Sequence, residues 1–186
     1  MQLFYIETKE LKIRQINLSD LDEFYFYRSN PEVTKYQSFD VLTFDQAKNF
    51  ITENLKNSIE TTGEWVQYGI ENKTTKKLIG DCAIKIDRQI NGIAEIGITI
   101  SHQEQKKGYA KQVLIGILNF LYEKKSVRRV VEIVDEENIA SINLLKSVGF
   151  RQEGHFIENI FIKGKWVNEL YFAMLKREWD KKNNSL

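Results

Sequence analysis

Residues 105–110 have the residue types of an anion-binding site. They read Gln-Lys-Lys-Gly-Tyr-Ala, and they join a strand-like run that ends at Ile100 to a strongly helical segment. The first turn of a helix has backbone N–H groups without partners and the positive end of the helix dipole, so it attracts anions. Gly108 lets a phosphate approach the backbone, while Lys106 and Lys107 add positive charge. The sequence therefore predicts a pyrophosphate-binding loop.

The spacing of this loop excludes two common nucleotide sites. The phosphate loop of nucleotide hydrolases needs Gly-Lys followed by Ser or Thr, and the dinucleotide-binding turn needs three glycines. Residues 105–111 contain neither pattern. The pattern Gln-x-x-Gly-x-Ala alone is a weak signal. The prediction of a pyrophosphate-binding loop therefore also depends on the strand and the helix on either side of it.

A strand, a helix and a second strand are predicted around the loop. Residues 93–100 alternate as a strand and lead into it. Residues 129–134 are an almost continuous β-branched run, typical of a strand buried in a parallel pair. Between these strands, apolar residues recur at three- and four-residue steps and predict a long helix: Ala110, Val113, Leu114, Ile117, Leu118, Leu121 and Tyr122. The loop is therefore expected between the first strand and this helix.

Gly97 lies inside the strand that precedes the loop, and it has two interpretations. A glycine weakens a strand because it has no side chain to pack. It also marks β-bulges, where a ligand can reach backbone groups. Both interpretations stay open from the residues alone.

The rest of the chain predicts two N-terminal helices and further antiparallel strands. Ser19 with Asp22, and Thr43 with Gln46, match capping boxes at helix starts. Asn138 has the residue type of a helix N-cap. The other predicted strands are residues 11–16, 65–71, 78–86, 156–162 and 166–175.

The composition is that of one folded domain. The chain has 186 residues, 42% of them hydrophobic and 28% charged, which excludes a mainly disordered protein and favours a single domain over residues 1–186. Only residues 181–186 are expected to fray. The formal charge of +1 leaves no global field that would attract nucleic acid.

Metal and membrane sites are also excluded by residue counts. One cysteine and two histidines do not make the usual zinc ligand sets. No stretch reaches the ~18 consecutive apolar residues that a membrane span requires, and the first residues lack a signal-peptide pattern. We therefore expect a cytoplasmic protein that has no metal and no membrane partner.

The loop and the helix that follows the next strand resemble a known family. Gln105, Gly108 and Ala110 match the Gln/Arg-x-x-Gly-x-Gly/Ala loop of the GNAT family of acetyl-CoA-dependent N-acetyltransferases. Residues 135–141 (DEENIAS) and 144–154 (LLKSVGFRQEG) resemble the branch with ribosomal-protein N-terminal acetyltransferases of the RimJ/RimL type. The resemblance covers about the whole chain.

The resemblance implies a fold and a binding site for acetyl-CoA. The expected fold is α/β of the α+β type, with a mixed, mostly antiparallel sheet of about seven strands and about four helices. The sheet is expected to splay at one parallel strand pair, where acetyl-CoA enters. The residues that this assigns to the cofactor are Ile98, Thr99, Ile100, Gln105, Lys106, Lys107, Gly108, Tyr109, Ala110, Lys111 and Asn138. For Asn138, a role as helix cap alone is the alternative.

The resemblance also implies candidates for the proton transfers. Many GNAT proteins protonate the leaving thiolate with a tyrosine, but Leu145 stands at that position here. Ser141 occupies the position of the serine proposed as donor in the RimL-like branch; an ordinary helix serine is the alternative. Glu95, through a water, and Glu158 are candidates for the general base. A relay by water without a dedicated base stays open, because an N-terminal amine is partly neutral at pH 7.

The resulting expectation is direct acetyl transfer to a primary amine, without a covalent acetyl-enzyme. The N-terminal α-amine of a protein, of the ribosomal type, is the first acceptor expected. Small amines (polyamines, aminoglycosides, amino acids) and a non-catalytic acyl-CoA sensor are the alternatives. The resemblance also implies that a homodimer is one assembly to expect, because dimers are common in this branch.

Overall fold

A computed structural model describes residues 4–59, 63–87 and 92–183 of the chain. Within these residues one mixed sheet of eight strands has the order β1-β2-β3-β4-β5-β6-β8-β7. The strands are β1 (Tyr5–Glu7), β2 (Leu11–Gln15), β3 (Val66–Asn72), β4 (Leu78–Ile86), β5 (Ile93–Ile100), β6 (Arg129–Asp135), β7 (Arg151–Ile162) and β8 (Lys165–Leu175). The predicted α/β class and mixed sheet are confirmed. The additional strand is β1, whose three residues are too few for a visible alternation.

Six helices flank the sheet in the described part of the chain, two more than expected. They are α1 (Leu21–Arg28), α2 (Pro31–Thr34), α3 (Phe44–Asn54), α4 (Tyr109–Lys124), α5 (Ile139–Val148) and α6 (Lys176–Asn183), with short 3-10 turns at Leu18–Asp20 and His102–Glu104. Of the tail predicted to fray, residues 181–183 belong to α6, and residues 184–186 lie outside the described residues.

The helix starts differ from the sequence-based expectation at one place. The first capping box is formed by Asn17 and Asp20, because a 3-10 turn precedes α1, so the predicted pair Ser19 and Asp22 was wrong. The predicted pair at Thr43 is confirmed, since its hydroxyl accepts a hydrogen bond from the Gln46 N–H and the Gln46 side chain bonds back to Thr43.

The sheet opens between β5 and β6, the parallel strands. Their pairing covers three residue pairs, from Ile93 with Arg129 to Glu95 with Val131. Beyond Glu95, β5 pairs on its β4 side alone, in a continuous register from Ala94 to Ile100. The β4–β5 register is unbroken at Gly97, so the bulge interpretation of this glycine was wrong. The predicted splay at one parallel pair is confirmed.

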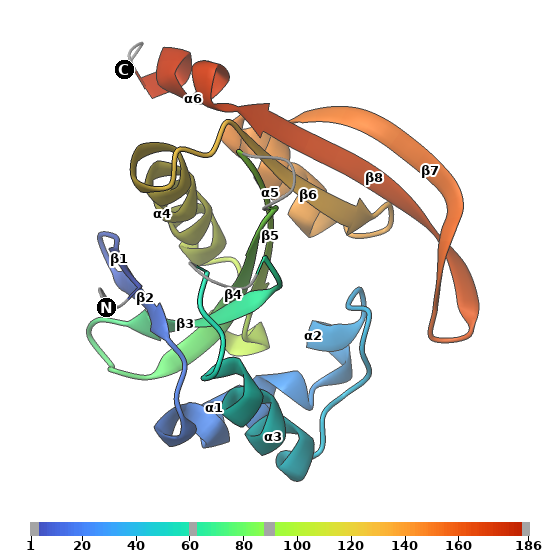
Figure 1. The fold of residues 1–186 in the computed structure, drawn as a ribbon. Helices are drawn as coiled ribbons and strands as arrows, with labels where there is room; N and C mark the ends of the chain where they lie inside the picture. Colours follow the sequence, from blue (N-terminus) through green and yellow to red (C-terminus); the bar gives the residue numbers. More distant parts are fainter. Residues whose placement is uncertain (1–3, 60–62, 88–91, 184–186) are drawn as a thin grey trace.

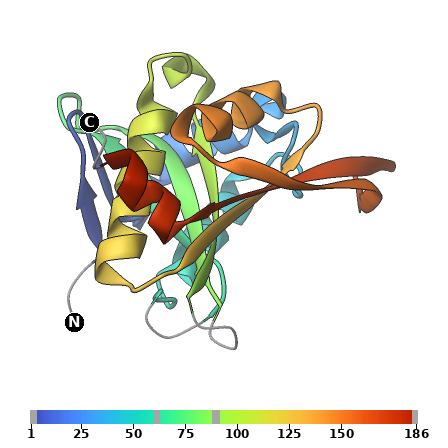
Figure 2. The ribbon, with the colours of Figure 1, turned by 90° about the horizontal axis from the view of Figure 1, so that it is seen from above.

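Helices and a long hairpin surround this opening. In Figure 1, α1, α2 and α3 lie below it, and the β7–β8 hairpin curves past it on the other side. Figure 2 shows the tip of that hairpin projecting away from the rest of the molecule. The hairpin tip touches the N-terminal helices, because Lys163 Nζ donates to the carbonyl of Thr34 at 2.6 Å. The opening is thus walled by segments from both ends of the chain.

A buried ion pair fixes α1 to the sheet. Asp81 on β4 is fully buried and accepts hydrogen bonds from the Tyr27 hydroxyl at 2.6 Å and from Arg28 Nε at 3.0 Å. The side-chain amide of Gln67 on β3 is a further donor to this carboxylate. Removing one partner of such a pair leaves an uncompensated buried charge, which costs about 3–5 kcal/mol. The position of α1 beside the opening is therefore strongly determined.

Candidate functional site

Two adjoining cavities occupy the opening between β5 and β6. One has a volume of about 430 Å³ and reaches toward α1 and the β7–β8 hairpin. The other has a volume of about 420 Å³ and reaches toward the start of α4. We name them the acceptor cavity and the cofactor cavity, respectively. Their shared lining consists of Tyr36, Gln37, Ile98, Thr99, Asn138 and Ser141.

The cofactor cavity is built on the predicted anion-binding loop. Gly108 is the N-cap of α4 with φ +80°, and a Cβ at this position would meet no atom within 4 Å. The side-chain amide of Gln105 donates to the carbonyl of Ile100 at 3.1 Å, which ties the loop to the end of β5. The first turn of α4 thus directs its N–H groups at open space, as an anion cradle requires.

The structure brings ten of the eleven predicted cofactor residues to this cavity. They are Ile98, Thr99, Ile100, Gln105, Lys106, Gly108, Tyr109, Ala110, Lys111 and Asn138. Lys107 does not line the cavity, and its side chain forms an ion pair with Glu104 at 2.9 Å. The residues present therefore fit the pyrophosphate and pantetheine of acetyl-CoA, with positive charge supplied by Lys106 and Lys111.

Asn138 and Ser141 lie where the two cavities meet. Asn138 Oδ1 accepts a hydrogen bond from the backbone N–H of Ser141 at 3.2 Å, which caps α5. Both residues line both cavities. The predicted cap is confirmed, and the same two side chains face the space where the reacting groups would meet.

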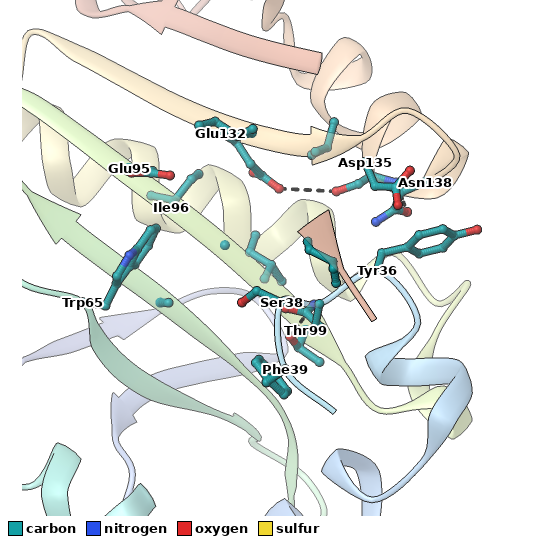
Figure 3. Close-up of a pocket in the computed structure, with 18 of the residues that line it drawn as sticks. Tyr36, Ser38, Phe39, Trp65, Glu95, Ile96, Thr99, Glu132, Asp135 and Asn138 are labelled. Carbon is teal, nitrogen blue, oxygen red and sulfur yellow. Dashed lines mark hydrogen bonds between the residues drawn. The ribbon is translucent and has the colours of Figure 1, made fainter. Parts of the chain in front are cut away.

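A buried acid that the sequence analysis missed, Glu132 on β6, contacts Ser141. The Ser141 hydroxyl and Glu132 Oε1 are 3.3 Å apart, and the dashed line from Glu132 in Figure 3 marks this bond. Only 6% of Glu132 is exposed, and its other oxygen, Oε2, is buried without a hydrogen-bond partner among the described residues. Burial raises the pKa of Glu132 to about 8, with a smaller contribution from the charge of Glu95.

The two predicted base candidates occupy different environments. Glu95 lines the acceptor cavity, and partial burial raises the pKa of its carboxyl while Lys85 opposes the shift. Glu158 is exposed and does not line the acceptor cavity. An irregularity in β7 between Phe156 and Ile160, with Glu158 at φ +48°, breaks the strand alternation, so that Ile160 lines the cavity.

Acidic and aromatic side chains form part of the lining of the acceptor cavity. Its lining includes four carboxylic side chains, Glu95, Glu132, Asp135 and Glu169, and four aromatic ones, Tyr36, Phe39, Phe50 and Trp65. Figure 3 shows Trp65 and Phe39 on the wall opposite Glu132 and Asp135. Arg28 is the one cationic residue of the lining, and it is paired with Asp81. The cavity therefore suits a cation with an apolar chain.

In the part of the chain that the structure describes, no group of three or more His, Cys, Asp or Glu residues could hold a metal ion. No helix in residues 4–59, 63–87 and 92–183 has the length and apolar character needed to cross a membrane.

Comparisons with known proteins agree with this geometry. The family model described as "Acetyltransferase (GNAT) domain" matches residues 10–151. The chain is 32% identical to the uncharacterized N-acetyltransferase p20 of Bacillus licheniformis, over 92% of this chain and 96% of the relative. An acetyltransferase of the GNAT family from Bacillus anthracis has the same fold, with a TM-score of 0.83, 24% identity, and coverage of 94% of this chain and 100% of that one.

A further solved structure is a spermidine N-acetyltransferase from Vibrio cholerae in complex with CoA and spermine. It has a TM-score of 0.78 and 22% identity, and the match covers 91% of this chain and 98% of that one. The splayed parallel pair, the loop at Gly108 and the match over most of the chain lead to one conclusion. The chain belongs to the GNAT family of N-acetyltransferases, which use acetyl-CoA.

Proposed function

We propose that this acetyltransferase acts on a small amine that carries a second positive charge, such as a polyamine. The observation that carries the proposal is the acidic lining of the acceptor cavity, with Glu95, Asp135 and Glu169 against one already paired cation, Arg28. The walls formed by Trp65 and Phe39 suit the methylene chain between two amines. The spermidine N-acetyltransferase with a similar fold agrees with this acceptor class.

The proposed reaction uses groups on both sides of the opening. Glu95 removes a proton from the acceptor ammonium, because only a neutral amine can attack the thioester carbonyl. A free backbone N–H of β5 near Ile98 stabilises the oxyanion that forms on that carbonyl. Ser141 donates a proton to the thiolate as the C–S bond breaks. The family resemblance assigns the N–H near Ile98 and Ser141, and the cavity lining supports both positions.

Release of the free thiol of CoA with a panel of acceptors tests the proposal. Spermidine and spermine are expected to give the highest kcat/KM among polyamines, an aminoglycoside, free amino acids and peptides that begin with Ser, Ala or Met. Glu169→Gln is expected to raise the KM for spermidine about tenfold while kcat changes little, because the carboxylate binds the distal charge. Equal activity on a singly charged amine such as propylamine would contradict the proposed acceptor class.

A protein N-terminal amine, which the sequence analysis favoured, is the second candidate. Apolar side chains are exposed along the β7–β8 hairpin at Phe161 and Trp166, next to the cavity-lining Ile160 and Ile162. Such a surface suits an extended peptide. Turnover that depends on a peptide and is absent with polyamines would select this candidate.

A further inference from the structure

Glu132 is a buried acid that the reaction described above does not use. One of its oxygens contacts the Ser141 hydroxyl at 3.3 Å, and the other is buried and has no hydrogen-bond partner in the part of the chain that the structure describes. An ionised carboxylate in this position would leave a buried charged atom without a hydrogen bond, which is costly. A carboxylic acid avoids this cost, because a neutral oxygen needs less compensation. The geometry therefore favours the protonated form of Glu132.

The surroundings of Glu132 also favour that form. The other acidic groups that line the same cavity are Glu95 on β5, Asp135 on β6 and Glu169 on β8. The cation on α1, Arg28, is bonded to Asp81. Burial is the largest cause that raises the pKa of Glu132 to about 8; the hydrogen bond with Ser141 lowers this pKa, and the charge of Glu95 raises it. At neutral pH the carboxyl thus holds a proton within reach of Ser141.

We propose that Glu132 stores the proton for the leaving group: its carboxylic acid replaces the proton that Ser141 gives to the thiolate of CoA. This inference rests on the proposed function. A protonated carboxyl has an O–H donor, and a serine hydroxyl rotates, so the 3.3 Å contact can carry a bond from Glu132 to Ser141 Oγ. The Ser141 O–H is then directed toward the junction of the two cavities, where the thioester sulfur would lie.

From the neutral amine onward, protons move between two carboxyl groups of the cavity, those of Glu95 and Glu132. The proton that Glu95 took from the ammonium first leaves to water, so Glu95 is ionised again when the neutral amine attacks. The neutral amine then forms the new C–N bond, and its surplus proton passes to Glu95. The C–S bond breaks, the thiolate takes the Ser141 proton, and the Glu132 proton passes to Ser141 Oγ. The cycle ends when the proton on Glu95 returns through water to the carboxylate of Glu132. The net reaction converts an amine and a thioester into an amide and a thiol.

Turnover of Glu132→Gln and Ser141→Ala is the first test, at saturating acetyl-CoA and amine. Glutamine keeps the shape of Glu132 but cannot release a proton, so kcat at pH 7 is expected to fall about 100-fold. Wild-type kcat is expected to fall above about pH 8, as Glu132 ionises, and this decrease is expected to disappear in Glu132→Gln. Because both residues act in one relay, the double variant is expected to be no slower than the slower single variant.

Matched controls and a measurement without turnover complete the test. Ser147→Ala, on α5, and Glu123→Gln, on α4, change exposed residues outside both cavities and are expected to leave kcat unchanged. The ¹³C NMR signal of the Glu132 carboxyl is expected to titrate near pH 8 in the wild type. It is expected to titrate still higher in Ser141→Ala, because the serine bond lowers this pKa.

The kinetic and NMR measurements distinguish a failure of the proton relay between Glu132 and Ser141 from a failure of the proposed function. Unchanged kcat in Glu132→Gln, additive losses in the double variant, or titration of Glu132 near pH 4.5 would each overturn the relay, although the acetyltransferase would stand. Absence of turnover with every amine would overturn the proposed function instead, and the NMR titration would still decide the protonation state of Glu132 beside Ser141.

Discussion

At Asn138, the cap of a helix and the proposed binding of the cofactor involve the same side chain. Its Oδ1 caps α5 by accepting from the Ser141 N–H, and the residue lines both cavities. Asn138→Asp keeps an N-cap of equal quality but removes the amide donor, so affinity for acetyl-CoA is expected to fall while the melting temperature stays constant. Asn138→Ala is expected to lower both, with a loss of about 1 kcal/mol of stability.

Calorimetric titration with CoA and thermal unfolding measure the two effects separately. If Asn138→Asp binds CoA as tightly as the wild type, Asn138 is a helix cap alone. That outcome would confirm the alternative that the sequence left open.

Glu132 makes the stability of the fold depend on pH in a direction opposite to that of most carboxylates. Its pKa is about 8 in the folded protein, against an ordinary value of 4.5. Between these two values the unfolded chain has lost the proton and the folded protein has kept it, so the free energy of unfolding falls as pH rises from 4.5 to 8. The loss is complete above pH 8 and amounts to about 5 kcal/mol at most.

Urea unfolding at pH 5 and pH 8 tests this linkage. Glu132→Gln is expected to be more stable than the wild type at pH 8, with a smaller difference at pH 5. The control Glu123→Gln, exposed on α4, is expected to follow the wild type at both pH values. A constant difference between Glu132→Gln and the wild type would show that Glu132 titrates alike in both states.

At the scale of single elements, the loop before α4 offers a test with an internal control. Gly108 and Gly164 both have φ +80°, and at both a Cβ would meet no atom within 4 Å. Alanine at either glycine is therefore expected to cost about 1 kcal/mol of stability through backbone strain. Only Gly108→Ala is expected to raise the KM for acetyl-CoA, about tenfold, because Gly164 lies at the tip of the β7–β8 hairpin. An equal KM for both variants would contradict the assignment of the loop to the pyrophosphate.

The loop could be predicted from the sequence because the residues that determine its backbone geometry are neighbours in the chain. A glycine at a helix start, preceded by a strand, determines the backbone geometry from neighbouring residues. Glu132 was missed for the opposite reason: it interrupts a β-branched run, and its burial beside Ser141 depends on how α5 packs on β6. Glu158 was considered for the site because the family resemblance implies an acid on this strand, and the irregularity before Ile160 has no signal in the sequence.

At the scale of the whole molecule, the proposed role of the acidic cavity predicts how activity depends on salt. The attraction between its carboxylates and a dication weakens as ionic strength rises, because the Debye length falls to ~8 Å at 0.15 M. The KM for spermidine is therefore expected to rise several-fold between 20 and 200 mM salt. The KM for propylamine, which has a single charge, is expected to rise less. Steady-state kinetics with both amines measure this difference, and equal salt dependence would contradict the cavity's role.

Assembly is also a property of the whole molecule. Large apolar side chains are exposed on the β7–β8 hairpin at Phe156, Ile157, Phe161 and Trp166. The homodimer that the family resemblance implies stays a prediction, which sedimentation equilibrium would test.

The three residue pairs between β5 and β6 give the protein a built-in dependence on its own substrate. The sheet consists of two halves, β1–β5 and β6–β8. In the described part of the chain, strand pairing joins them over Ile93–Glu95 and Arg129–Val131, next to two backbone hydrogen bonds to the Gly92 carbonyl. Bound acetyl-CoA would act as a strand between the halves, and a ligand present at 100 times its Kd adds about 2.7 kcal/mol of stability. Amide hydrogen exchange along Ile98–Ile100 would then slow on binding. A cell short of acetyl-CoA would contain a looser enzyme that proteases remove sooner, so the abundance of the enzyme would follow the supply of acetyl groups.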